Sequence, residues 1–274
     1  MRLAEGPTPL RHVVALGLLQ GPAELLPVSS SGHTTLIPWL AGWPYAKLDG
    51  SARKSFELAL HAGTAVALAI DMREELQQDA AQLNPRRAAA LVLSIAPPAL
   101  AGLAMRGTVE RRLSGPRSIA VGLLAGGVAM VLADARSQQG ERGCGDAQPA
   151  DGLALGVAQA LALIPGVSRS GATLTAARAR GFDRPASHSL SWLAALPVLL
   201  GASLLEAGRL SRGASIDRRT AGLLAVGGTS AFLSTLLSSR ILRRGGYRDR
   251  ALLPYSLYRC LLAALVLGRL RRAR

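Results

Sequence analysis

Two stretches of the chain run for about 20 residues without a charged side chain. They are residues 186–205 and 220–239 of the 274-residue sequence. A helix of about 20 apolar residues crosses the hydrocarbon core of a bilayer, which is about 30 Å thick. Because no water is present there, the backbone must satisfy its own hydrogen bonds, and these stretches predict membrane-spanning helices. Further stretches with few or no charges lie at about 12–46, 58–70, 88–105, 118–133, 152–168 and 251–268.

The composition agrees with an all-α integral membrane protein of about six transmembrane helices. Hydrophobic residues make up 49% of the chain and charged residues 18%, against about 25% charged in soluble domains. With 30 glycines and 4% aromatic residues, the chain suits small-residue helix packing in lipid. Residues 88–105 carry Pro97 and Pro98 midway, which predicts a kinked span. Arginines occur in most connectors, so the positive-inside rule does not orient the chain.

The net charge of +15 bears on the partners of the protein. A basic balance is typical of proteins that bind nucleic acid, anionic lipid headgroups or phosphorylated substrates. The arginines lie between apolar runs and lack interleaved aromatic residues, which disfavours nucleic acid. The lipid bilayer and a phosphorylated substrate are therefore the expected partners. Cys144 and Cys260 form neither a disulfide framework nor a metal-binding pattern.

An internal repeat interrupts the apolar sequence twice. The segments are GLLQGPAELLPVSSSGH (17–33) and GVAQALALIPGVSRSG (156–171), and their glutamines, Gln20 and Gln159, lie 139 residues apart. Each segment continues through an apolar turn to a proline and ends in a serine-rich stretch closed by glycine. Paired interruptions in corresponding halves point to inverted repeats whose broken helices meet inside the membrane. The alternative is that both are ordinary loops between spans.

The first interruption carries groups suited to acid-base chemistry. Gln20 and Glu24 are four residues apart and share one helix face. A carboxylate inside the membrane is a functional hypothesis by default, because it is costly to bury unpaired. A structural glutamate paired with an arginine is the alternative. His33 follows directly on a serine cluster that includes Ser29 and Ser30, so hydroxyls and an imidazole are gathered nearby.

The second interruption carries groups suited to binding an anion. Arg169 is the one cation in an otherwise uncharged region, and Ser168, Ser170 and Thr173 surround it with hydroxyls. The planar guanidinium matches phosphate oxygens, and hydroxyls and N–H groups at a helix start complete a cradle. A salt bridge from Arg169 to Glu24 without any ligand is the alternative. If the two interruptions meet, the combined groups fit hydrolysis of a phosphoester or diphosphate.

The motifs QGPAELLPVSSSGH and PGVSRSGAT closely resemble the two signature motifs of the bacterial undecaprenyl-diphosphate phosphatase family, the bacitracin-resistance type. The segments FELALHAGTAVAL (56–68), SLSWLAALPVLLGA (189–202) and PYSLYR (254–259) resemble family segments in the expected order. His61 stands where the family pattern leads us to expect glutamine, and His188 is also atypical. We expect neither departure to affect the residues of the two motifs.

The resemblance implies a multi-pass enzyme of the bacterial plasma (inner) membrane. Its substrate would be the C55 isoprenyl diphosphate, whose terminal phosphate it removes to recycle the lipid carrier of cell-wall synthesis. It also implies one membrane domain over residues 1–274, with six spans and two re-entrant helix pairs arranged as inverted repeats. The halves would be about 12–134 and 151–268, joined by a connector at 135–150. A homodimer is a further partner that we consider.

Carried over residue by residue, the resemblance assigns the site. Glu24, Ser30, His33 and Arg169 would be catalytic, and a divalent cation, Mg²⁺ or Ca²⁺, would be held by Glu24 and substrate oxygens. Two schemes stay open: Ser30 attacks phosphorus with His33 or Glu24 as base, or Glu24 activates water. In either scheme His33 can protonate the leaving lipid phosphate. The residues expected to bind substrate are Gln20, Ser29, Ser168, Ser170 and Thr173.

Two other functions compete with this one. The type-2 phosphatidic acid phosphatases also carry Ser-Gly-His and Ser-Arg motifs, but they need a second histidine about six residues after the arginine, followed by an aspartate. Thr175 and Ala179 stand there instead. A transporter or flippase of polyprenyl phosphate is the alternative from another class, because broken helices in inverted repeats are a transporter architecture. Arg259, far from both motifs in sequence, is interpreted as a structural ion pair or as snorkelling to the interface.

Overall fold

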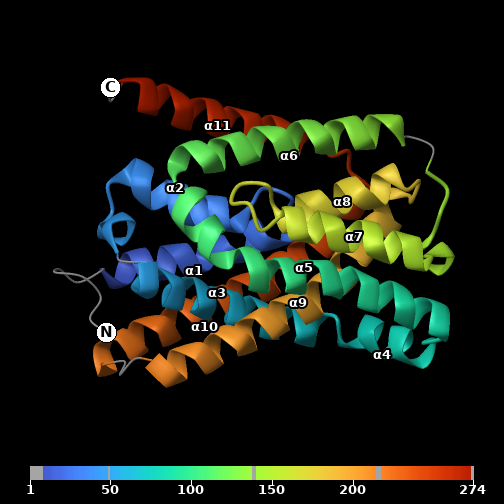
Figure 1. The fold of residues 1–274 in the computed structure, drawn as a ribbon, viewed down its shortest axis with the longest axis horizontal. Coiled ribbons are helices and arrows are strands. Elements are labelled where there is room, and N and C mark those ends of the chain that lie inside the picture. The colour runs from blue at the N-terminus through green and yellow to red at the C-terminus, as the bar shows by residue number, and fades with distance from the viewer. Residues whose placement is uncertain (1–8, 49, 138–139, 214–216, 273–274) are drawn as a thin grey trace.

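The computed structural model describes residues 9–48, 50–137, 140–213 and 217–272, and these ranges fold into helices without a β-strand (Figure 1). Three short 3₁₀ turns join the α-helices: η1 (Pro44–Lys47), η2 (Cys144–Asp146) and η3 (Tyr247–Asp249). The α-helices are α1 (Leu10–Leu25), α2 (Ser30–Ala41), α3 (Gly50–Asp71), α4 (Arg73–Ala81), α5 (Pro85–Arg112), α6 (Pro116–Arg136), α7 (Pro149–Leu161), α8 (Arg169–Ala179), α9 (Arg184–Gly213), α10 (Arg218–Arg244) and α11 (Leu253–Arg272).

Five of these helices are long and apolar enough to cross a membrane. They are α5, α6, α9, α10 and α11. The pair α3 and α4 passes the same test together and bends by 64° at the break between them, which gives up to six spans. The sequence-based prediction of an all-α membrane protein with about six spans is therefore confirmed.

Two helical hairpins are built from helices much shorter than the spans. α1 and α2 have 16 and 12 residues, and α7 and α8 have 13 and 11. At about 1.5 Å per residue each is too short to cross about 30 Å of hydrocarbon alone. Figure 1 shows the two hairpins approaching the middle of the molecule from opposite ends. Their turns coincide with the two repeated sequence segments, so both interruptions fall between paired half-length helices.

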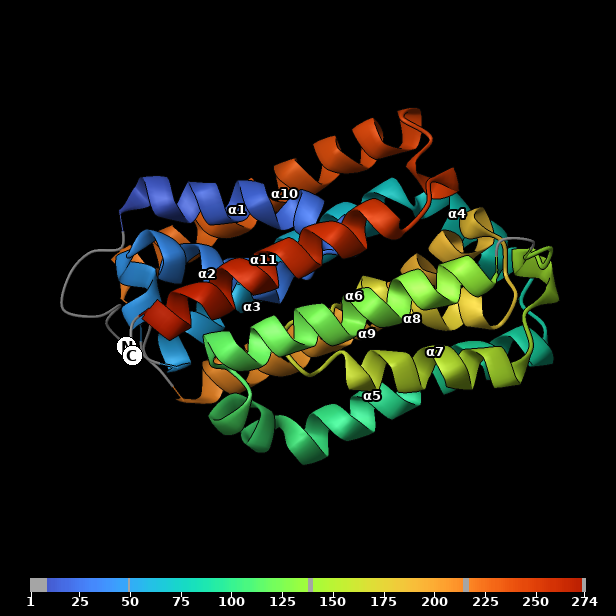
Figure 2. The same ribbon diagram turned by 90° about the horizontal axis from the view of Figure 1, so that it is seen from above.

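The two halves of the chain are packed into each other. Helix α1 lies along α10, and α7 lies along α5, so each hairpin packs against a span of the other half. Figure 2 shows α6 and α11 side by side on one face of the bundle, in agreement with their direct contact. Close approach of α1 to α10 depends on Gly17 and Gly21: a Cβ at either position would come within 2.5 Å of atoms of Ser230 or Ser234. Small residues spaced four apart permit this packing in lipid.

One of the two prolines of α5, Pro98, is accommodated by the second glutamine of the repeat. Pro97 and Pro98 lie inside α5, which continues through them. Pro98 has no N–H, so the carbonyl of Ser94 one turn earlier loses its helical partner. The Nε2 atom of Gln159 donates to this carbonyl at 2.9 Å. Gln159 thus supplies the hydrogen bond that proline removes, as helices in lipid require.

Buried carboxylates paired with arginines hold together one end of the molecule. Asp134 of α6 accepts from Arg178 at 2.9 Å and from Arg184 at 3.0 Å. Asp151, in the first turn of α7 and outside the spans, accepts at 2.6 Å from both Arg142 and Arg180. Burial disfavours the charge on Asp151, but these hydrogen bonds outweigh burial and lower its pKa to about 2.

Candidate active site

The turns of the two hairpins share an unusual backbone conformation. Ser29 and Ser168 have φ angles of 78° and 70°, and among the described residues they are the non-glycine residues with positive φ. The Oγ of Ser29 accepts from the N–H of Gly32 at 3.3 Å, and the Oγ of Ser168 accepts from the N–H of Gly171 at 3.2 Å. The sequences SSSG and SRSG therefore cap their helices in the same way. Strained serines of this kind cost about 1–3 kcal/mol each and cluster at functional sites.

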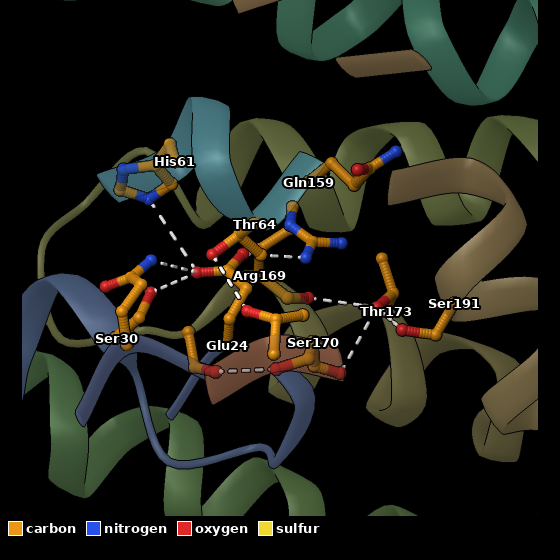
Figure 3. A network of polar contacts seen from close by, with 12 residues as sticks. Glu24, Ser30, His61, Thr64, Gln159, Arg169, Ser170, Thr173 and Ser191 are labelled. Carbon is orange, nitrogen blue, oxygen red and sulfur yellow. Dashed lines mark hydrogen bonds and ion pairs between the residues drawn. The ribbon is translucent and has the colours of Figure 1, made fainter. Parts of the chain in front are cut away.

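Glu24 lies where the two hairpins meet (Figure 3). Its Oε1 accepts from Nη2 of Arg169 at 2.9 Å, across 145 residues of sequence. Its Oε2 accepts from Oγ of Ser30 at 2.5 Å and from Nε2 of Gln20 at 3.2 Å. The side chain is only 5% exposed. The expectation that the two interruptions meet at one buried site is thus met, with the carboxylate of the first half against the guanidinium of the second.

The guanidinium of Arg169 retains unused donors. In the described structure its Nε and Nη1 atoms are buried and have no hydrogen-bond partner. Buried donors are normally paired, so two unpaired donor nitrogens beside one carboxylate call for an explanation. Arg169 begins α8 and Ser30 begins α2, and helix starts favour negative charge. The orphaned donors therefore mark a place that an anion fits.

The hydroxyls of the second hairpin bind it to the first hairpin and to α9 near Arg169. The Oγ of Ser170 donates to the carbonyl of Leu26 in the first hairpin at 3.1 Å and lies 3.3 Å from Oγ of Ser168. Thr173 lies one turn further along α8, and its Oγ1 is 2.6 Å from Oγ of Ser191 in α9. Ser168 and Ser170 thus lie at the junction. The hydroxyl of Thr173 instead joins α8 to α9, as its contact with Ser191 in Figure 3 shows.

His33 is held by partners other than Glu24. Its Nδ1 is 2.7 Å from the carbonyl oxygen of Ser29, which can only accept, so Nδ1 carries a proton. Its Nε2 is 2.5 Å from the hydroxyl of Tyr258 in α11, and the two rings stack with centroids 5.5 Å apart. Both ring nitrogens are therefore occupied. The expected catalytic set is close together in space, but His33 makes its contacts on the side facing α11.

His61 is a site residue that the sequence reasoning missed. Its Nε2 lies 3.7 Å from Oε2 of Glu24, and its Nδ1 is 2.8 Å from the carbonyl oxygen of Glu57 one turn earlier in α3. The expectation that this departure from the family pattern leaves the motifs untouched is therefore wrong. The sequence offered one signal for this contact, namely that the family pattern has glutamine at position 61. Glutamine, like histidine, can donate a hydrogen bond to a carboxylate such as that of Glu24. His188, the other departure, packs against Tyr247 in a different part of the bundle.

A metal ion would find few protein ligands here. The residues that the structure describes include no cluster of three or more His, Cys, Asp or Glu side chains. Glu24 is one carboxylate, and both of its oxygens already accept hydrogen bonds. Mg²⁺ is commonly held by one or two carboxylates together with substrate phosphates and water. The donor set therefore fits a cation that arrives with a diphosphate, rather than one held by protein ligands alone.

Comparison with known proteins identifies the family of the chain. The family model described as bacitracin resistance protein BacA matches residues 13–265. A curated protein of Geobacter sulfurreducens named undecaprenyl-diphosphatase is 35% identical over 94% of this chain and 97% of its own length. A protein of the same name from Nitrosococcus oceani is 37% identical over 93% of this chain and 97% of its own length. The chain is a member of the BacA family of bacitracin-resistance proteins.

Proposed function

We propose that this protein is an undecaprenyl-diphosphatase, which hydrolyses the terminal phosphate of C55 isoprenyl diphosphate to give undecaprenyl phosphate and inorganic phosphate. The observation that carries the proposal is the buried junction at which Arg169, with two unpaired donor nitrogens, lies against Glu24. Relatives that match more than nine-tenths of the chain bear this enzyme name. An embedded site between short helices also suits a substrate whose reactive end is polar and whose tail is lipid.

Arg169 and the helix starts would bind the diphosphate. The Nε and Nη1 atoms of Arg169 are free to donate to phosphate oxygens, and the first N–H groups of α2 and α8 add partial positive charge. This cluster would stabilise the charge that develops on the transferred phosphoryl group. The hydroxyls of Ser29, Ser168, Ser170 and Thr173 would hold the turns that present these donors. Gln20 would orient Glu24 through its hydrogen bond at 3.2 Å.

Glu24 would act as the general base. In the serine scheme, Oγ of Ser30 gives its proton to Glu24 and attacks the terminal phosphorus, the anhydride P–O bond breaks, and the lipid phosphate leaves. Water then hydrolyses the phosphoserine and regenerates Ser30. The hydrogen bond of 2.5 Å from Ser30 to Glu24 favours Glu24 over His33 as base, because both nitrogens of His33 have other partners. In the water scheme, Glu24 takes the proton from an attacking water instead.

His33 and a divalent cation complete the proposal. His33, carrying a second proton on Nε2, would protonate the leaving lipid phosphate after exchanging its contact with Tyr258 for the substrate, and would regain that proton from the water consumed in the reaction. Mg²⁺ or Ca²⁺, bound by Glu24 and diphosphate oxygens, would supply Lewis acidity. The chain would lie in the bacterial inner membrane as one domain whose halves are inverted repeats. Homodimerisation is a separate prediction, which the mass of the purified protein–detergent complex tests.

The test is release of inorganic phosphate from C55 isoprenyl diphosphate by the purified protein in detergent. We expect steady turnover, and a protein that releases no phosphate with or without Mg²⁺ or Ca²⁺ contradicts the proposal in favour of a transporter. The Ser30→Ala variant separates the two schemes. Loss of more than about 10³-fold in kcat, with phosphoserine trapped in the wild-type protein at low pH, identifies Ser30 as nucleophile. Loss of about tenfold or less supports attack by water.

A further inference from the structure

Arg259 of α11 is a fully buried cation that binds no carboxylate among the described residues. Its side chain is 0% exposed, and its recorded partners are main-chain carbonyls. It forms neither the ion pair nor the interface contact expected from sequence. A buried charge is costly unless its donors are satisfied. An arginine buried without a carboxylate is therefore expected to have a structural or functional role.

The carbonyls that Arg259 binds belong to both hairpin turns. Its Nη1 donates to the carbonyl of Pro27 in the first turn at 3.3 Å. Its Nη2 donates in the second turn to Gly166 at 3.1 Å and to Val167 at 2.8 Å. The remaining partners, Leu123 at 3.3 Å and Gly122 at 3.4 Å, lie in α6. One guanidinium therefore ties two turns, which lie far apart in sequence, to a membrane span.

The space around the guanidinium is kept free by glycines. A Cβ at Gly171 would come within 2.6 Å of Nη1 of Arg259, and a Cβ at Gly126 would collide with Nη2. Gly171 is the closing glycine of the second motif. The planar fork of arginine offers five N–H donors in fixed directions, whereas lysine offers one compact ammonium. The site is thus shaped for a guanidinium.

The carbonyls of the turns that Arg259 binds lie one or two residues before the strained serines. Val167 precedes Ser168, and Pro27 lies two residues before Ser29. These serines begin the helices that carry Arg169 and Ser30. We propose that Arg259 is a positioning residue, which fixes the distance between the two turns and so places Arg169 and Ser30 against Glu24. The proposal rests on the proposed function for its kinetic test, but its geometric claim can be tested without activity.

The kinetic test compares Arg259→Lys with a variant that only destabilises the fold. Phe182→Ala serves as the control, because Phe182 is 0% exposed and packs in a separate cluster with Leu155 and Ala177. The Tm of each protein is measured first. The values of kcat and KM are then determined at a temperature well below the lowest Tm. We expect Arg259→Lys to lower kcat about 100-fold, since a misplacement of about 1 Å can cost that much. KM should change by less than about threefold, because the lipid tail is unaffected.

The control decides what the loss means. Phe182→Ala should lower Tm at least as much as Arg259→Lys while keeping kcat within about threefold. If Arg259→Lys retains kcat as well as Phe182→Ala does, the positioning role is refuted. A wild-type protein that releases no phosphate refutes the proposed function instead, and the geometric arm then decides the role of Arg259.

The geometric arm measures how closely the turns approach each other. Leu26→Cys and Ser170→Cys are introduced into a background in which Cys144 and Cys260 are replaced by alanine, and a short bifunctional thiol reagent is added. Ser170 contacts the carbonyl of Leu26 directly, so the pair should cross-link readily. Adding Arg259→Lys should lower the yield about fivefold, and adding Phe182→Ala should leave it unchanged. An equal yield with and without Arg259→Lys contradicts the proposal.

Discussion

The contact between Glu24 and Arg169 predicts that activity and stability respond in opposite ways to a second mutation. We consider Glu24→Gln, Arg169→Gln and the double variant. The N–O distance is 2.9 Å and both side chains are at least 85% buried, with exposures of 5% and 15%. At an effective dielectric constant of about 20, opposite charges about 4 Å apart attract by roughly 4 kcal/mol. Removing one partner leaves the other charge buried and unpaired.

Each single variant should therefore be destabilised, and the double variant should recover. A broken buried pair costs about 3 kcal/mol, whereas replacing both partners is close to neutral. For a chain of this size that corresponds to a Tm lowered by roughly 6 °C in each single variant, with most of the loss restored in the double variant. Differential scanning fluorimetry in detergent measures this difference.

Activity should show no such recovery. Each single variant removes a charge that the reaction needs, which typically costs about 10²- to 10³-fold in kcat. Groups that act as one unit are non-additive, so the double variant should be about as inactive as the worse single variant. The reasoning is refuted if the two stability losses simply add, or if either single variant turns over at a rate near that of the wild type.

Three further predictions concern other parts of the protein. Tyr258→Phe removes the hydroxyl that contacts His33 and should lower kcat about tenfold with little change in Tm; unchanged kinetics would exclude a role for this contact. His61→Gln should keep kcat within about threefold, because an amide can still face Glu24, whereas His61→Glu should lower kcat about 10²-fold by like-charge repulsion; equal rates for the two variants contradict this. Because Asp151 has a pKa lowered to about 2, its charge should stabilise the fold by about 2 kcal/mol above pH 4 and lose this effect as the pH falls toward 2. The Tm difference between wild type and Asp151→Asn should close over that range, and a constant difference would contradict the assignment.

The membrane spans and the two turns could be predicted because their signals are local. An uncharged stretch of about 20 residues specifies a spanning helix whatever its neighbours are. The repeated serine and glycine pattern specifies a capped helix start, and Ser29 and Ser168 adopt nearly the same φ in the structure. The meeting of Glu24 with Arg169 followed from the repeat, because paired breaks in two halves converge on one place.

The residues that sequence reasoning missed depend on how helices pack. His61 reaches Glu24 only because α3 turns that face toward α1, and this packing cannot be derived from the sequence around His61 alone. Arg259 binds carbonyls of turns that precede it by more than 90 residues, and main-chain acceptors leave no trace in side-chain composition. Tyr258 contacts His33 across 225 residues. Such partners are set by tertiary structure and not by local pattern.

The most direct test of the account is an experimental structure with a non-hydrolysable bisphosphonate analogue of a polyprenyl diphosphate. The measured quantity is the distance from the analogue's phosphonate oxygens to Nε and Nη1 of Arg169, the two donors that are unpaired in the described structure. The account predicts at least one distance near 3 Å, with the terminal phosphorus beside Ser30 and Glu24. An analogue bound in another part of the bundle, with the guanidinium of Arg169 still engaged only by Glu24, would contradict it.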